Sequence, residues 1–157
     1  MSSFKKVQPG LIGGQAIDAV SASAKHPLGQ IVQAKDLAST EYGQGEFIYL
    51  VGVASTVVGS VVTYDAGGFT TALAAANAVG GIAVAMSANV ASRYGWYQIS
   101  GRGVVKGLAS LAADKLCYLT ATADAIHFME TTSALNTPSS GLAEVTLSRP
   151  FVTNESN

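Results

Sequence analysis

The sequence predicts a mainly β protein, a small antiparallel β-barrel or sandwich with an extended N-terminal arm. Three observations lead to this prediction. Short β-type runs separated by Gly, Asp and Asn fill the chain from Gly45 onward. Residues 1–44 show no comparable periodicity. The length of 157 residues gives room for one domain with a single core, or for a smaller domain with a long arm.

The N-terminal region, residues 1–44, is predicted to be an extended arm. A helix over Gln15–Ala24 would have only Ile17 and Val20 as apolar anchors, which is too few for a stable short helix. The apolar side chains of this region are too dispersed to form a core, and their spacing suits contact with a neighbouring surface. The predicted contact residues of the arm are Phe4, Val7, Leu11, Ile12, Leu28, Ile31 and Val32.

The β domain is predicted over residues 45–152, followed by a flexible polar tail over residues 153–157. The density of candidate strands is that of a small all-β domain. The expected strands are Glu46–Val53, Ser60–Tyr64, Phe69–Leu73, Gly81–Met86, Gly95–Ser100, Gly103–Lys106, Leu116–Thr120, Ala125–Met129 and Ala143–Ser148.

Two segments of the β domain are predicted to form hairpin turns, and two have a helical alternative. Asp65–Gly68 offers glycines for the positive-φ positions of a turn, and Ala121–Asp124 separates two further strands. Thr71–Val79 is rich in Ala, and Leu108–Lys115 has apolar residues three and four apart, so a short helix is the alternative at both places.

Charge and composition exclude several classes of function. Charged residues make up 12% of the chain and the formal net charge is -1, so no basic field exists to bind nucleic acid. The single cysteine excludes an intramolecular disulfide framework. Two uncharged runs, 47–64 and 66–92, are broken by polar residues and glycines, so no membrane span is expected. The start of the chain lacks the apolar stretch of a signal peptide, and assembly in the cytoplasm is expected.

No pattern in the sequence predicts catalysis, a cofactor or a metal site. His26 and His127 have no Cys, Asp or Glu at metal-ligand spacing. No nucleophile elbow or complete dinucleotide fingerprint occurs. We therefore expect that the protein is not an enzyme and that it uses no catalytic, cofactor-binding or metal-binding residues.

The aromatic run Tyr94–Ile99 leaves two interpretations open. With strand alternation, Trp96 lies on one face and Tyr97 on the other, so at least one of them is predicted to reach an interface or the surface. Core or subunit-interface packing is favoured, and Trp96 and Tyr97 join the predicted contact residues. A sugar-stacking platform that also includes Tyr94 is the alternative.

Five segments of the sequence carry a resemblance to known proteins: Leu28–Asp36, Gly45–Leu50, Gly52–Thr56, Gly59–Tyr64 and Tyr94–Gly101. They resemble a family of small capsid decoration proteins of tailed bacteriophages, also described as head cement or head fibre proteins. The resemblance covers about residues 28–130. It implies a β-rich domain with an N-terminal arm on the outer surface of the virion head, often clustered as a trimer.

The expectation from composition agrees with this resemblance. A small domain with few charges leaves few groups to keep its surface solvated, which favours a subunit of an assembly. The expected function is therefore to decorate and stabilise a capsid by binding across capsomers, with the major capsid protein lattice and further copies of this chain as partners. The alternatives are a glycan-binding or receptor-binding surface module and another virion assembly subunit, such as a tail-tube protein.

Overall fold

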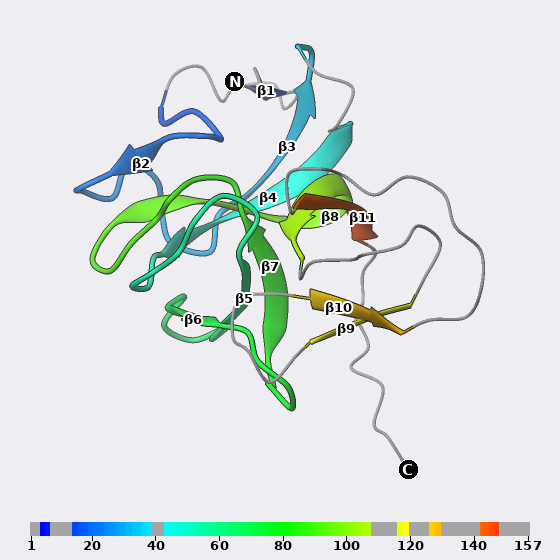
Figure 1. Ribbon diagram of the computed structural model, residues 1–157. Helices are drawn as coiled ribbons and strands as arrows, with labels where there is room; N and C mark the ends of the chain where they lie inside the picture. The colour runs from blue at the N-terminus through cyan, green and yellow to red at the C-terminus, as the bar shows by residue number, and fades with distance from the viewer. Residues whose placement is uncertain are drawn as a thin grey trace.

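The described part of the chain consists of β-strands joined by turns, which confirms the mainly β prediction (Figure 1). The computed structural model describes residues 4–6, 14–38, 43–107, 116–119, 126–129 and 142–147. A nine-stranded antiparallel sheet and a separate two-stranded sheet contain all the strands in these ranges. The strands are β1 (Phe4–Lys6), β2 (Val20–Ser21), β3 (Ile31–Asp36), β4 (Gln44–Val51), β5 (Val61–Tyr64), β6 (Thr71–Leu73), β7 (Gly81–Ala85), β8 (Tyr94–Lys106), β9 (Leu116–Leu119), β10 (Ile126–Met129) and β11 (Leu142–Leu147).

Strands β4 and β8 form the centre of the large sheet. Its order is β1-β3-β4-β8-β7-β5-β6, and β2 and β11 pair with the two ends of β8. Tyr49 of β4 lies opposite Trp96 of β8, and Ile48 lies opposite Tyr97. Because alternate residues of a strand point to opposite faces, Tyr49 and Trp96 lie together on one face of the sheet, and Ile48 and Tyr97 lie together on the other.

Strand β8 joins two of the expected strands into one. It runs for 13 residues without interruption through Gly101, which has a positive φ of 98°. A side chain at this glycine would approach the backbone of Gln44 and Gly45, so glycine allows β4 to lie close to β8. Beyond it, β8 pairs with β11 from Gly101 to Lys106.

The sheet curls after β8 without closing. Strand β5 pairs with both β7 and β6, and β6 leads back to the end of β4. There Thr70 forms a single bridge with Val51, and the Val51 amide donates to the Phe69 carbonyl at 3.1 Å. The return to β4 is thus made by isolated contacts and not by a full ladder of strand pairs.

The expected arm is wrong for residues 14–38, which fold onto the domain. Residues Ile31–Asp36 form β3, and β3 pairs with β4 over five residues, so the expected boundary at residue 44 falls inside the sheet. Strand β1 pairs with the outer edge of β3. The reason lies in the alternation of β3, in which Val32, Ala34 and Asp36 are buried and the residues between them are exposed. Residues 1–3, 7–13 and 39–42 and the expected tail lie outside the described residues.

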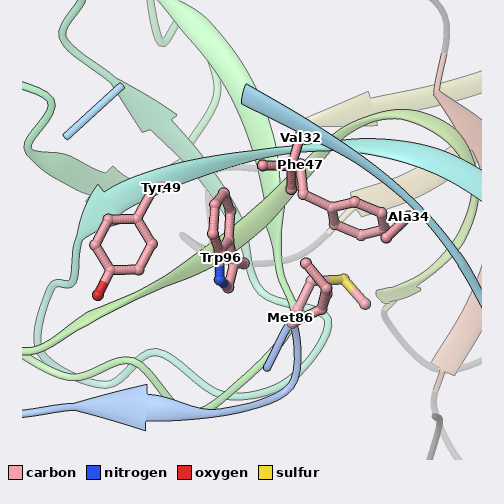
Figure 2. Packing of buried hydrophobic residues seen from close by; sticks show 7 residues of the cluster. Val32, Ala34, Phe47, Tyr49, Met86 and Trp96 are labelled. Atoms are coloured by element: carbon pink, nitrogen blue, oxygen red, sulfur yellow. The ribbon is translucent and has the colours of Figure 1, made fainter. Parts of the chain in front are cut away.

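Two hydrophobic layers cover the two faces of the central strands, where the sequence predicted a single core. One lies inside the curl and includes Ile48, Leu50, Val62, Tyr97 and Ile99. The other lies on the opposite face, where Figure 2 shows its residues; its members are Ile17, Val32, Ala34, Phe47, Tyr49, Met86 and Trp96. The N-terminal residues close this second layer, because Ile17 belongs to it and Phe4 and Leu28 pack against it.

The structure also decides between the alternatives at the turns. Thr71–Val79 is not a helix, because it begins with β6 and continues as turns. The turn between β5 and β6 is present, but its positive φ lies at Phe69, at 54°, and not at the glycines of Asp65–Gly68. Gln15–Ala24 contains turns and β2 and no helix. Strands β9 and β10 pair as the expected hairpin, while Leu108–Lys115 and Ala121–Asp124 lie outside the described residues.

Candidate interaction surface

The structure buries three of the six described residues that the sequence predicted as contacts, and two more are half-buried. Trp96, Tyr97 and Val32 have no exposed surface, and Phe4 and Leu28 are half-buried against the second hydrophobic layer. Ile31 is the exception, with 39% of its surface exposed. The expectation that Trp96 or Tyr97 reaches the surface was wrong, because both faces of β8 are covered. Val7, Leu11 and Ile12 lie outside the described residues.

A cluster of polar and aromatic groups surrounds Trp96 on the face that the N-terminal residues cover. The Tyr49 ring centroid lies 4.9 Å from that of Trp96, and the His26 centroid lies 5.0 Å from it. Lys6 Nζ lies 4.9 Å from the centroid of the Trp96 ring, in the geometry of a cation–π contact. These four side chains come from β1, β4, β8 and the segment before β3.

Gln15 links this cluster into a network of hydrogen bonds. Its side-chain Nε2 donates to the carbonyls of Ala19 at 2.6 Å and Tyr94 at 2.8 Å, and its Oε1 accepts from the Tyr49 hydroxyl at 2.7 Å. Its backbone carbonyl accepts from Trp96 Nε1 at 3.1 Å. Gln15 therefore attaches residues 14–19 to both central strands, and its burial carries little penalty because its polar atoms are paired.

Burial changes the proton affinity of the groups in this cluster. It raises the pKa of the Tyr49 phenol, and the hydrogen bond from the Lys25 amide acts in the opposite sense. It lowers the pKa of Lys6. These shifts follow from the cost of placing a charge where water is excluded. The same rings give no site for a sugar, because Tyr49 and Trp96 have no exposed face on which a ligand could stack.

A second polar cluster lies around the Tyr97 hydroxyl inside the curl. Asn89 Nδ2 donates to this hydroxyl at 3.0 Å, and hydrogen bonds with Thr71 and Thr56 also reach it. Burial raises the pKa of Tyr97, which keeps the phenol protonated, and these hydrogen bonds oppose the shift. The cluster fixes the loops that carry Thr56 and Asn89 to the end of the curled sheet.

Metal-binding and membrane-spanning features are missing from the described ranges. Among residues 4–6, 14–38, 43–107 and the three later strands, no three His, Cys, Asp or Glu side chains gather as a metal site would require. The described part of the chain also holds no helix that is long and apolar enough to cross a bilayer.

Three neighbouring segments of the large sheet carry exposed valines, and we call these valines together the loop end. It comprises Val20 of β2, Val57 and Val58 of the loop after β4, and Val90 of the loop after β7, with 39, 44, 44 and 42% of their surfaces exposed. Figure 1 shows β2 and the turn between β7 and β8 together at the left of the molecule. The loop after β4 joins them, because the Gly52 amide donates to the Arg93 carbonyl at 2.8 Å.

The loop end carries few charges. Residues 52–60 contain none, residues 86–93 contain Arg93, and residues 15–25 contain Asp18 and Lys25. Gly52 allows two of the segments to touch, because a side chain there would overlap the carbonyls of Asn89 and Val90. This surface was not predicted from the sequence. The signal that was present is the Val57-Val58 pair in an uncharged stretch between two strands.

Comparisons with known proteins add no relative. No protein-family model, no curated protein and no solved structure matches the chain.

Proposed function

We propose that the protein is a structural subunit of a bacteriophage virion that decorates and stabilises the outer surface of the head. The sequence strings between residues 28 and 130 support the virion assignment by their resemblance to capsid decoration proteins. The observation that carries the binding mode is the loop end, a surface of half-exposed valines with few charges. Low-charge apolar surface of this kind suits contact with another protein.

The loop end replaces the N-terminal arm as the proposed contact with the capsid lattice. Of the described arm residues, Val32 is buried, Phe4 and Leu28 are half-buried against the second hydrophobic layer, and only Ile31 stays exposed. Covering the exposed part of one half-buried valine contributes roughly 1 kcal/mol, so a single loop end binds weakly. Repetition over a symmetric lattice, together with clustering of copies, makes the total attachment strong.

Stabilisation of the head follows from binding linkage. A subunit that binds only the assembled lattice makes disruption of the lattice more costly by the free energy of binding. This role requires no turnover and no cofactor. The glycan-binding alternative loses support, because Trp96 and Tyr97 are buried and only half-buried Tyr94 remains of its proposed platform.

The test is binding of the purified protein to heads of the encoding virus that lack it, measured by co-sedimentation. The double variant Val57→Asp/Val58→Asp places two charges on the loop end, and we expect it to lose binding by at least about tenfold. The control is Val79→Asp. Val79 is 93% exposed and lies just before β7, near the Tyr64–Gly81 end of the β5–β7 pair. Val57 and Val58 lie just before β5, near the opposite, Val61–Val84 end, so the control adds its charge away from the loop end.

The two variants give opposite results if the proposal is correct. The Val79→Asp protein binds as the wild type does, and the loop-end variant stays folded but remains in the supernatant. Equal binding by all three proteins contradicts the loop end as the contact surface. Failure of the wild-type protein to bind heads contradicts head decoration, and its growth into rings or tubes in light scattering supports a tail-tube subunit instead.

A further inference from the structure

His26 occupies a place on the second hydrophobic layer that is shaped to its ring. Gly14 faces the imidazole, and a side chain at position 14 would overlap His26 Cε1 and Nε2. The backbone of Gly14 has a φ of 90°, which favours glycine. On its other sides the ring contacts Tyr49, at a centroid distance of 5.2 Å, and Trp96, at 5.0 Å. The imidazole thus lies between the start of the N-terminal segment and the two central strands.

The contact of His26 with this segment depends on its protonation state. The backbone N–H of Gln15 donates a hydrogen bond to His26 Nε2, with 3.2 Å between the two nitrogens. Only the neutral imidazole with its proton on Nδ1 can accept at Nε2, because both ring nitrogens of the cation carry protons. Protonation at Nε2 therefore replaces this hydrogen bond with two donors that face each other.

The surroundings of His26 also disfavour a second positive charge. Lys6 of β1 already places its ammonium group over the Trp96 ring, and this group is buried without a hydrogen-bond partner among the described residues. Burial and then the charge of Lys6 lower the pKa of His26, and the Gln30 side chain acts in the opposite sense. The phenol of Tyr49 on β4 stays neutral at acidic pH, because burial raises its pKa, and Trp96 of β8 does not titrate.

We propose that His26 is an acid-sensitive clasp, in which uptake of one proton by the imidazole loosens residues 14–26 from the face formed by β4 and β8. The released segment includes β2 and with it Val20 of the loop end. The clasp is a property of the isolated chain, so it can be tested without a capsid and does not depend on the proposed function.

The direction of the pH effect follows from linkage. A histidine whose pKa is lower in the closed state than its ordinary value of 6.5 contributes stability that is fully present above that value. The contribution falls as the pH drops below 6.5 and is lost once the pH passes below the pKa of the closed state. Acidification therefore opens the clasp, and neutral pH closes it.

Hydrogen exchange on the full chain tests the clasp, with protection factors corrected for the intrinsic exchange rate at about pH 7.5 and about pH 5. Between these two pH values, the protection of amides in residues 14–26 should fall. The fall should be about tenfold for each pH unit by which the pKa of His26 in the closed state lies below the ordinary histidine value. Amides of β4 and β8 should keep their protection. Equal protection of residues 14–26 at both pH values would overturn the proposal.

Two variants assign the effect to one side chain. His26→Gln provides a carbonyl oxygen that accepts a hydrogen bond and does not titrate, so its protection of residues 14–26 should be the same at both pH values. His127→Gln removes the other of the two histidines of the chain and should keep the wild-type fall. A fall in His26→Gln as large as in the wild type contradicts the clasp.

A measurement on the wild-type protein keeps the proposal testable if His26→Gln does not fold. An NMR titration of the His26 Cε1 proton gives the midpoint of its protonation. This midpoint should coincide with the midpoint for loss of protection in residues 14–26. Separate midpoints contradict the clasp.

Discussion

The two faces of the central strands are closed in different ways. Inside the curl, the layer around Leu50 and Val62 is closed by the sheet itself, through the ladders of β5, β6 and β7. On the opposite face, the layer around Trp96 is closed by a segment that contains one two-residue strand and is held by side-chain hydrogen bonds. The cover of the second face therefore depends on a few polar contacts between residues far apart in the sequence. We expect this face to open before the layer inside the curl.

Truncation of one large side chain on each face should give the largest effects. Trp96→Ala removes a fully buried ring, and we expect the free energy of unfolding to fall by about 3–5 kcal/mol. Leu50→Ala should cost about 2–5 kcal/mol. Denaturant titration measures both values. Hydrogen exchange should then show an additional loss of protection in residues 14–26 for Trp96→Ala alone, and the same pattern in both variants contradicts the comparison.

Removal of the Gln15 side chain should open the second face and leave the layer inside the curl closed. Gln15→Ala deletes three side-chain hydrogen bonds, and we expect local opening of residues 14–26 to become about 2–3 kcal/mol easier by hydrogen exchange. The matched control is Gln33→Ala on the exposed side of β3, which should change stability by less than about 0.5 kcal/mol. Loss of protection throughout the layer inside the curl in Gln15→Ala would show that the two faces are not separable.

Removal of one tyrosine hydroxyl on each face gives two closely matched variants with smaller expected losses of stability. Tyr97→Phe deletes the acceptor of Asn89 Nδ2, and Tyr49→Phe deletes the donor to Gln15 Oε1. Each variant should lose about 1–2 kcal/mol of unfolding free energy in thermal or chemical denaturation. Only Tyr49→Phe should also reduce the protection of residues 14–26, and an equal reduction in Tyr97→Phe would be evidence against distinct closures.

The smallest expected effect is a difference in the pH at which the turn between β5 and β6 and residues 14–26 respond to acid. Hydrogen bonds from the Gly68 and Gly67 amides lower the pKa of Asp65 in the turn between β5 and β6. The contribution of these hydrogen bonds to the stability of the turn is fully present above pH 3.8, the ordinary pKa of an aspartate. It is lost as the pH falls through the lower pKa that Asp65 has in the folded state. NMR should therefore show the Gly68 amide shifting only in strong acid, well below the range in which residues 14–26 respond. A Gly68 shift near pH 6 would contradict this separation.

The strands of the central sheet were predictable from sequence because they are short, largely apolar runs between turn residues, and β4 and β8 are buried on both faces. The runs that became β4, β5, β7 and the two halves of β8 are rich in β-branched and aromatic residues. Strand β3 was missed because its inward positions include Ala34 and Asp36, which do not mark an apolar face. The continuity of β8 through Gly101 was missed because a glycine between two runs reads as a turn, whereas here it allows close approach of β4.

The candidate sites were less predictable than the strands. Trp96 and Tyr97 were correctly assigned to opposite faces, but the cover over Trp96 comes from Gln15, which is 81 residues away in the sequence. No local pattern reveals such a contact. The loop end forms where three segments of the chain become neighbours. Their contact follows from the order of the strands in the sheet, so the sequence of any one segment does not predict it.

Cryo-electron microscopy of virus particles that contain the protein tests the central proposal most directly. We expect density for a 16.0 kDa β domain at repeated positions on the outer surface of the head, with the loop of Val57 and Val58 against the lattice. Density for this chain in the tail only, or on the head with the loop end facing solvent, would contradict it.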